Sequence, residues 1–494
     1  MTPVDLAEVL RRVADSAGAP TVAFGDDTRT LADELAAGDA LVEALLAAGV
    51  RPQDRVAVYD TTSPLVVRAL YAAAVVGAVL VPINFRWSRD EVLGVLDDAA
   101  AAVVVAGPGA PHDLADVVRV VREEPPREPV VRRQVEHREI LVQMYTSGTT
   151  GRPKGVLISH DNLVGKFLRE PNPWDIGSGS VVLACMPLFH IGGLGWLVGA
   201  LVRSADVVVA ETATPATVLD AVRRYGVTHL FLVPAALSAL VDAQGDSAMP
   251  SLTTIAYGAS PMEPWLLATV MERWDVDFVQ GYGLTETTGQ VVSLSGADHR
   301  AWRSRTGPWP VGRPDPGVEV SVRPVGDGDG IDGLDELLVR GPQVALGYRG
   351  SGPVADADGW FATGDLGRVD ADGFVYVLDR VKDLIISGGE NVMPAEIEQL
   401  LEGSGLVREA AVVAVPSERW GEVPLALVVG SAPLAPADVE VLHDLCRDRL
   451  AVFKRPAGIE VVAELPRNAV GKILKRELRD AWYGWGPVEQ GASR

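Results

Sequence analysis

The strongest constraint on the fold is an alternation of short apolar segments with longer helical segments that begins near residue 55. Residues 55–59 have the composition of a strand, 64–76 of a buried helix and 78–83 of a second strand. A capping box at 88–91 starts the next helix, and 102–106 form a third strand. This order favours parallel strands with helices on both faces. The sequence therefore predicts an α/β fold.

The same alternation resumes after a charged, proline-containing stretch at residues 123–139, which we expect to be an exposed connection. A helix is expected at 194–201, and another at 216–225 that Gly226 closes. The further expected strands are 181–183, 206–210, 229–233, 253–257 and 277–280.

Composition changes near Val311, where antiparallel patterns at residues 318–322, 337–339 and 374–377 predict a β-rich subdomain. The C-terminal part is of α+β type. Its expected helices start at 394, 436 and 472, and its expected strands are 411–415, 425–429 and 459–463. With 494 residues, the chain is too long for one ordinary core. We predict a large N-terminal domain, 1–380, with two α/β subdomains and the β-rich one, and a small C-terminal domain, 381–494.

The net charge of −22 argues against a nucleic-acid partner, because such a partner needs a basic surface. Two cysteines, Cys185 and Cys446, cannot form a disulfide framework, so we expect both to fill the core. The N-terminal residues do not look like a signal peptide, and the longest apolar run is too short to span a membrane. We therefore expect a cytoplasmic protein. The sequence leaves a homodimer open.

A loop at residues 145–156 has the chemistry of a phosphate site. Its glycines let the backbone approach a ligand, its hydroxyls can donate hydrogen bonds, and Lys154 adds a cation. It differs from a P-loop because Gly155, not Ser or Thr, follows the lysine. A metal bound with the phosphate must find its ligand elsewhere.

A second segment supplies that ligand. Residues 281–286 follow a predicted strand, at the end where open α/β sheets bind ligands. Within this segment Tyr282 offers a flat ring, Thr285 a hydroxyl and Glu286 a carboxylate.

These two segments, with 258–261, 359–367, 376–383 and 466–476, resemble the ordered motifs of the adenylate-forming acyl-CoA synthetases over roughly residues 30 to 480. The resemblance implies that Lys472 and Thr285 stabilise the transition state and that Glu286 holds Mg²⁺. The residues that it assigns to ATP or AMP are Thr146, Ser147, Gly148, Thr149, Thr150, Gly151, Lys154, Gly258, Ala259, Ser260, Gly281, Tyr282, Gly283, Leu284, Asp365 and Arg380.

The resemblance also implies a mobile C-terminal domain with its hinge at Lys382. It places Ser387, Gly388 and Gly389 at the pantetheine arm of coenzyme A. The acyl pocket would be lined by His190, Ile191, Gly192, Leu194 and Trp196, with His190 as a catalytic or gating residue; a histidine that only fills the core is the alternative.

The implied function is that of an acyl-CoA synthetase that uses ATP, Mg²⁺ and coenzyme A. Amino-acid-activating relatives carry an aspartate where His190 stands, so an amino acid is disfavoured. The segments 191–200, 231–240, 257–264 and 281–290 contain no Lys or Arg, which favours an apolar monocarboxylic acid: fatty, alicyclic or aryl. Three alternatives are a ligase that loads a carrier protein, a nucleotide-binding regulator without turnover and, more distantly, a luciferase-like oxygenase.

Overall fold

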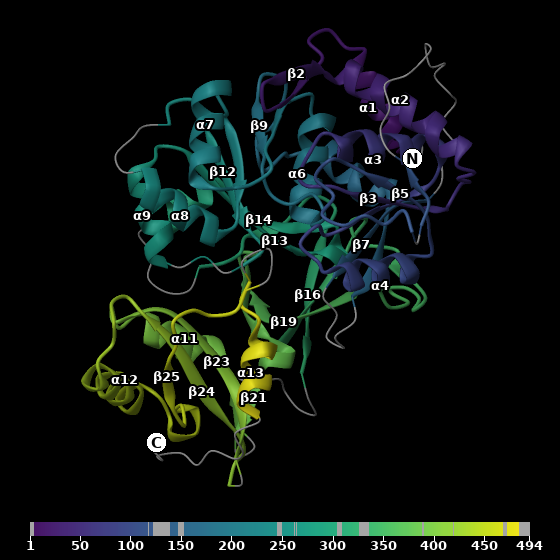
Figure 1. The fold of residues 1–494 in the computed structure, drawn as a ribbon. Helices are drawn as coiled ribbons and strands as arrows, with labels where there is room; N and C mark the ends of the chain where they lie inside the picture. The colour runs from purple at the N-terminus through teal and green to yellow at the C-terminus, as the bar shows by residue number, and fades with distance from the viewer. Residues whose placement is uncertain are drawn as a thin grey trace. The chain divides into compact units, whose positions relative to one another are not determined.

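The computed structural model describes residues 4–116, 118–121, 139–146, 153–244, 249–260, 262, 264–303, 309–325, 335–387, 390–417, 419–467 and 472–483. The chain forms two compact units (Figure 1). The first comprises Met1–Val320 with Val339–Phe361, and the second Ser321–Leu338 with Ala362–Arg494. A domain boundary at residues 380 and 381 stays a prediction. None of the helices described is both long and apolar enough to cross a membrane.

The first unit contains a seven-stranded sheet in which the predicted parallel strands are confirmed. β3 (Arg55–Tyr59) lies between β4 (Val79–Pro82) and β5 (Ala101–Ala106) and is parallel to both. The other strands are β6 (Val120–Val121), β7 (Ile140–Thr146), β8 (Lys154–Ser159) and β18 (Gly347–Tyr348), in the order β18-β8-β7-β4-β3-β5-β6. β8 is antiparallel to both of its neighbours.

A nine-stranded sheet forms the other half of this unit. Its central strands are parallel neighbours, and all five of those predicted after residue 180 are present. The order is β15 (Arg313–Pro314), β14 (Gly289–Leu294), β13 (Asp277–Leu284), β12 (Thr254–Gly258), β11 (His229–Leu232), β9 (Val181–Ala184), β10 (Asp206–Val209), β1 (Thr21–Phe24) and β2 (Asp27–Thr30).

Helices fill the space between these two sheets and cover their outer faces. One apolar cluster joins residues of both sheets to α1 (Leu6–Ala14), α2 (Leu31–Ala47), α3 (Leu65–Val76) and α6 (Ile191–Val202). A second packs the other face of the nine-stranded sheet, where α7 (Pro215–Tyr225), α8 (Pro234–Gln244) and α9 (Pro264–Arg273) lie together beside β12 (Figure 1). α4 (Arg89–Ala99), with the predicted capping box of Ser88 and Glu91, covers the seven-stranded sheet. Further short helices in the described part of this unit include α5 (His160–Leu163), η1 (Gly165–Leu168) and α10 (Gly296–Trp302).

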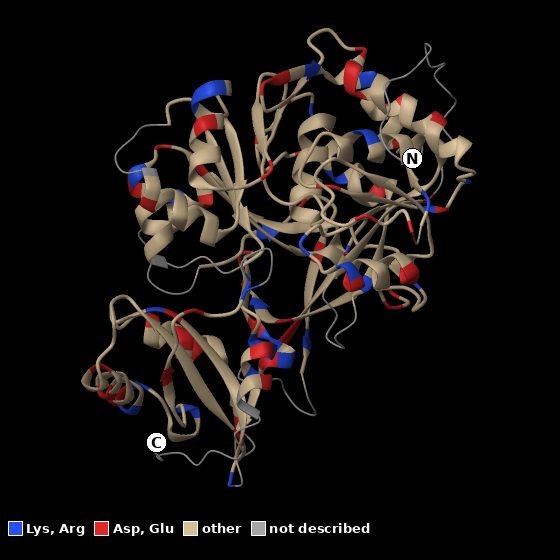
Figure 2. Ribbon diagram, in the orientation of Figure 1, with Lys and Arg blue, Asp and Glu red and all other residues tan. Residues whose placement is uncertain are grey.

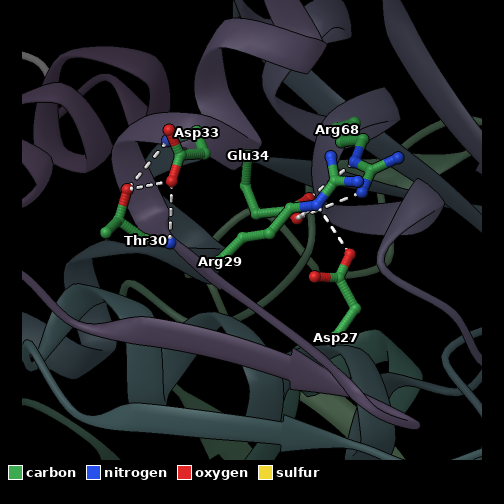
Figure 3. Close-up of polar contacts among 6 residues, drawn as sticks. All are labelled: Asp27, Arg29, Thr30, Asp33, Glu34 and Arg68. Atoms are coloured by element: carbon green, nitrogen blue, oxygen red, sulfur yellow. Dashed lines mark hydrogen bonds and ion pairs between the residues drawn. The ribbon is translucent and has the colours of Figure 1, made fainter.

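A buried ion pair links α2 to α3 (Figure 3). Arg68 Nε donates to Glu34 Oε2 at 2.6 Å, and Arg29 approaches the same carboxylate at 4.0 Å while it pairs with Asp27 at 2.8 Å. Thr30 caps α2 by accepting a hydrogen bond from the backbone of Asp33. Because a buried charge needs a partner, the pair fixes α2 against α3 and has no part in the chemistry below.

The β-rich pattern after Val311 is confirmed as a four-stranded sheet in the order β16-β17-β19-β20. Its strands are β16 (Glu319–Pro324), β17 (Asp335–Arg340), β19 (Phe361–Val369) and β20 (Val375–Arg380). β19 and β20 form an antiparallel hairpin in which Asp365 is opposite Arg380.

The C-terminal part is an α+β structure, as predicted. The long hairpin of β23 (Val407–Ser417) and β24 (Gly421–Gly430) is extended by β25 (Ile459–Val461), β21 (Ile385–Ser387) and β22 (Glu390–Val392). The accompanying helices are η3 (Val381–Asp383), α11 (Pro394–Glu402), α12 (Pro436–Arg449), η4 (Val452–Lys454) and α13 (Lys475–Tyr483). Acidic and basic residues are interspersed on α12 and α13 (Figure 2).

One predicted boundary is wrong: Lys472 does not open a helix. Ile473 forms a β-bridge with Arg467, and the Leu474 N–H donates to the Pro466 carbonyl at 2.8 Å. This extended pairing occupies the backbone before α13, so the helix begins only at Lys475. Both cysteines are buried in apolar clusters, as expected. The connection predicted at 123–139 falls almost wholly outside the described residues.

Candidate functional site

Two paired glycines of neighbouring strands, one of them at the carboxyl end of β12, keep the backbone open for a ligand. Gly258 ends β12 and is paired with Gly281 of β13. A Cβ added at Gly258 would lie 2.3 Å from the Gly281 carbonyl oxygen, so no larger residue fits there. The next residue, Ala259, is exposed and has a left-handed φ of 67°, which is uncommon for a residue with a side chain. Ser260 is partly exposed. The strand ends thus expose polar backbone at the edge where α/β sheets bind ligands.

The β13–β14 hairpin carries the predicted Tyr282, Thr285 and Glu286, and all three side chains are partly exposed. The two strands of this hairpin approach closely at Gly283, where a Cβ would lie 2.0 Å from the Gly289 carbonyl oxygen. The turn at η2 (Thr285–Thr287) is fixed by Thr287, whose hydroxyl accepts from the Leu284 N–H at 2.8 Å. Thr285 and Glu286 therefore project from a turn of defined shape.

Tyr348 joins Glu286 to the lysine of the glycine-rich loop. The Tyr348 hydroxyl donates to Glu286 Oε1 at 3.0 Å, and Lys154 Nζ lies 5.4 Å from the centre of the Tyr348 ring. Burial, and then the Glu286 carboxylate, raise the pKa of Tyr348, so the phenol stays a hydrogen-bond donor at neutral pH. The first unit thus brings the proposed metal carboxylate and the loop cation to one aromatic side chain.

The rest of the glycine-rich loop is only partly described. Thr146 ends β7 and is paired with Lys154, the first residue of β8. Gly155 packs against Gln143, and its Cβ position would lie 2.7 Å from Gln143 Nε2. Ser147, Gly148, Thr149, Thr150 and Gly151 lie outside the described residues.

Magnesium fits a site with one carboxylate. Among the described residues, no group of three or more His, Cys, Asp and Glu side chains is arranged to hold a metal ion. Mg²⁺ bound with a nucleotide keeps several waters and takes phosphate oxygens, so it needs only one or two protein carboxylates. Glu286, oriented by Tyr348, is suited to that role.

The predicted acyl-pocket residues come from the first turns of α6 and from His190, which precedes it. Gly192 faces Phe231, and its Cβ position would lie 3.0 Å from a ring carbon of that residue. Ile191 is partly exposed, whereas Leu194 and Trp196 are buried in the core between the sheets. The Trp196 ring lies 5.8 Å from that of Phe231, and its Nε1 donates to the Leu183 carbonyl.

His190 immediately precedes α6 and is neutral at physiological pH. Burial, and then the charge of Arg86, lower its pKa to about 4. Its ring centre lies 4.5 Å from that of Phe189, and within the described parts of the chain its Nε2 has no hydrogen-bond partner. An unsatisfied buried nitrogen can serve a ligand, so the gating role and the core-filling role both stay open.

One buried cation of this region was missed in the sequence. Lys166, in η1, donates from Nζ to the carbonyls of Thr288 and Gln290 at 2.9 and 3.4 Å. Its ammonium lies 3.5 Å from the Cβ position of Gly289, and Ile191 Cγ1 lies at the same distance from that point. No periodicity or motif in the sequence indicates a role for Lys166. Its long side chain brings the ammonium group to the β13–β14 hairpin.

In the second unit, Asp365 and Arg380 form an ion pair. The Arg380 Nε lies 2.7 Å from Asp365 Oδ1, and the Asp365 side chain is buried. The Asp365 N–H donates to Thr363 Oγ1 at 3.0 Å, which holds the strand in place. A carboxylate and a guanidinium fixed together can bind a sugar diol or a phosphate.

Lys472 lies in the electric field of the same pair. Burial lowers its pKa to about 8; Arg380 and Lys382 act in the same direction, and Asp365 and Asp383 oppose it. Lys382, the proposed hinge, lies in η3, directly after Arg380 and β20. The second unit therefore brings together four side chains from three separate sequence motifs.

The proposed coenzyme A segment is described only at Ser387. This serine ends β21, is fully buried, and is opposite Gly421 of β24. Within the described residues its hydroxyl has no hydrogen-bond partner. Gly388 and Gly389 lie outside the described part of the chain.

Family comparisons match both units. Residues 10–349 match the model of the AMP-binding enzyme family, and residues 396–472 match that of the AMP-binding enzyme C-terminal domain. The first match alone spans more than half of the 494 residues.

The chain is similar along nearly its whole length to named ligases. It is 36% identical to a feruloyl-CoA synthase of an Amycolatopsis species, with 95% of this chain and 97% of that protein covered. It is also 36% identical to the fatty acid–[acyl-carrier-protein] ligase ScoC of Streptomyces coeruleorubidus, over 90% of both.

The fold matches the o-succinylbenzoate CoA synthetase of Bacillus subtilis in complex with its acyl-adenylate intermediate. The TM-score is 0.85 at 30% identity, and 97% of this chain and 99% of that chain are covered. The same enzyme has been solved with ATP and a magnesium ion.

Proposed function

The chain belongs to the AMP-binding enzyme family, and we propose that it is an AMP-forming ligase that joins a carboxylic acid to the thiol of coenzyme A. The observation that carries this proposal is the local assembly of separate motifs: Lys154 and Glu286 meet at Tyr348, and Lys472 lies in the field of Asp365 and Arg380. The named relatives are CoA or carrier-protein ligases, which supports the same activity.

In the first half-reaction, a carboxylate oxygen of the acid attacks the α-phosphorus of ATP. The bond from that phosphorus to the bridging oxygen of the β-phosphate breaks, and pyrophosphate leaves with the electron pair. The carboxylate is already a nucleophile, so the protein must align the reactants and offset charge. Mg²⁺ held by Glu286 would supply positive charge to the phosphate oxygens.

The chain's own residues divide the remaining work. Thr285 donates to an α-phosphate oxygen, and the protonated Lys472 offsets the charge that develops between acid and nucleotide. Tyr282 stacks on the adenine, Asp365 accepts from the ribose hydroxyls, and the glycine-rich loop with Lys154 holds the departing pyrophosphate. Each well-placed donor typically contributes about 3 kcal/mol to a transition state of this kind.

In the second half-reaction, the thiolate of coenzyme A attacks the acyl carbonyl and AMP leaves. We propose that a rotation at Lys382 removes Lys472 and admits the pantetheine arm beside Ser387, Gly388 and Gly389. Lys382→Pro should therefore retain acid-dependent exchange of pyrophosphate into ATP and lose thioester formation. A loss of the exchange reaction instead would refute the hinge assignment.

The acid is proposed to be an apolar monocarboxylic acid. The aromatic and glycine-lined start of α6 supports this proposal, as does the feruloyl-CoA synthase relative, which favours an aryl acid over a fatty one. A fatty acid, and with it a role in fatty-acid metabolism, is the second choice, which the ScoC relative supports. A cytoplasmic location is also proposed.

The direct test is a screen for acid-dependent pyrophosphate release over aliphatic, alicyclic and aromatic acids, with coenzyme A as acceptor. The expected result is AMP, pyrophosphate and acyl-CoA in equal amounts with at least one class. If none of these acids supports release of pyrophosphate, the proposed substrate class is refuted. The double variant Glu286→Gln, Lys472→Ala is the negative control for release that does not depend on the proposed site.

A second candidate acceptor is the phosphopantetheine of a carrier protein, which the ScoC relative favours. Replacing coenzyme A by a holo carrier protein in the same assay separates the two. A regulator without turnover is the weaker alternative, because Glu286 and Lys472 are both present. It predicts nucleotide binding without AMP release.

A further inference from the structure

Lys166 has an unusual environment for a cation. Its ammonium has three N–H donors, and two of them point to the carbonyls of Thr288 and Gln290. Its remaining neighbours include the rings of Phe167 and Trp174, with centres 5.1 and 6.0 Å from Nζ. Across the described residues, no carboxylate forms an ion pair with it. Buried ammonium groups usually have such a partner, so this one has a donor to spare.

The spare donor lies beside the start of α6. A Cβ added at Gly289 would lie 3.5 Å from both Lys166 Nζ and Ile191 Cγ1, so the two side chains approach the same point. Lys166 keeps part of its surface exposed although its ammonium is buried, and Ile191, Gly289 and Phe231, whose ring faces Gly192, are also partly exposed. The cation therefore borders the residues that line the proposed acyl pocket.

The charge around Lys166 selects the kind of group that it can bind. Asp315 is buried, accepts from the Gln290 side chain at 3.2 Å and partly balances the lysine electrostatically. A second carboxylate on the substrate would be attracted by the lysine but repelled by the Asp315 carboxylate. A neutral oxygen accepts the N–H without adding a charge, so it suits the site better.

The reacting carboxylate is a poor candidate for this contact. An ammonium bonded to it would stabilise the ground-state carboxylate and so lower its nucleophilicity. The aromatic ring of Phe231 offers a stacking surface to a flat substrate. The oxygen in question is therefore a substituent on that substrate, away from its carboxylate.

We propose that Lys166 determines specificity by donating a hydrogen bond to a neutral ring oxygen, such as a phenolic hydroxyl, of an aromatic acid. This inference rests on the proposed ligase function. The proposal is consistent with the absence of Lys and Arg from the segments 191–200, 231–240, 257–264 and 281–290. Lys166 lies outside them, in η1, and its side chain reaches the proposed pocket from there.

The test compares cinnamic acids that differ only at position 4 of the ring: hydroxyl, methyl, hydrogen and carboxylate. The wild-type protein should prefer 4-hydroxycinnamate over 4-methylcinnamate by about tenfold or more in kcat/KM, because a charged donor left without its acceptor is costly. In Lys166→Met this ratio should fall below about threefold. Lys454→Met, in which a lysine paired with Glu396 is lost from the second unit, should retain the wild-type ratio.

Three results would overturn the inference: a wild-type ratio below about threefold, an unchanged ratio in Lys166→Met, or a 4-carboxylate that is the best substrate. An unchanged ratio with an equal loss of kcat/KM for all four acids would show that Lys166 only positions other residues. If the methionine variant does not fold, Lys166→Arg, which moves the charge, should still shift the ratio. If neither these four acids nor any acid of the wider screen supports release of pyrophosphate, the ligase function itself is refuted, so the two failures are distinguishable.

Discussion

Lys166 and Lys472 have similarly lowered pKa values, but their surroundings are very different. Burial lowers the pKa of both to about 8. Lys472 lies among two acids and two other cations, Asp365, Asp383, Arg380 and Lys382, within the second unit. Lys166 lies among backbone carbonyls and aromatic rings of the first unit, with Asp315 and Arg169 as its charged neighbours.

The difference teaches that a shifted pKa alone does not distinguish a catalytic lysine from one that recognises a substrate. A lysine among other charged side chains can offset the charge that develops on phosphate. A lysine held by two carbonyls has its direction fixed, so it can select one acceptor atom. The following experiments test this contrast.

The largest effect is expected for Lys472→Ala. Adenylate formation should fall by about a hundredfold or more, because a transition-state donor is removed. Thioester formation from a supplied acyl-adenylate should be spared. Both half-reactions are measured separately, by pyrophosphate exchange and by acyl-CoA release. An equal loss in both would contradict the assigned role.

Lys475→Ala should lower stability instead of adenylation. Lys475 Nζ lies 2.8 Å from Glu398 Oε1, and both side chains are mostly buried. Removal of the lysine leaves a buried carboxylate unpaired, which costs about 3 kcal/mol in the free energy of unfolding. Urea unfolding measures this loss. The exposed pair of Arg476 and Asp480 is the matched control, because Arg476→Ala should cost less than about 1 kcal/mol.

Glu286→Gln should raise the Mg²⁺ concentration needed for half-maximal pyrophosphate release by about tenfold or more. Tyr348→Phe, which removes only the hydrogen bond to this carboxylate, should have a smaller effect in the same direction. A magnesium requirement that neither variant changes would show that the metal ligand lies elsewhere.

The smallest effect concerns pH. The protonated form of Lys472 is the one that offsets charge, so adenylation of unsubstituted cinnamate should decline as pH rises through about 8. His190, with a pKa lowered to about 4, does not titrate in this range. Lys472→Arg should remove the decline, because arginine stays protonated. If the decline in adenylation persists in Lys472→Arg, the titrating group is a residue other than Lys472.

The sequence determined the class of fold and most of the element order. Strands and helices have distinct periodicities that local residues set, which is why β3, β4 and β9 could be predicted. It also determined which residues belong to the motifs, because glycine, lysine and carboxylate at fixed spacing reflect backbone and phosphate chemistry. The start of α13 was missed, since the pairing of Ile473 with Arg467 is a contact between segments.

Only the tertiary structure decided what surrounds each motif. Tyr348 is 62 residues from Glu286, and Lys166 is 122 residues from Thr288, yet each pair is hydrogen-bonded. Such contacts depend on how sheets and helices pack, and no local pattern encodes them. The physical reason is that a long side chain carries its charge away from its own backbone, so where Lys166 acts is set by the hairpin it reaches.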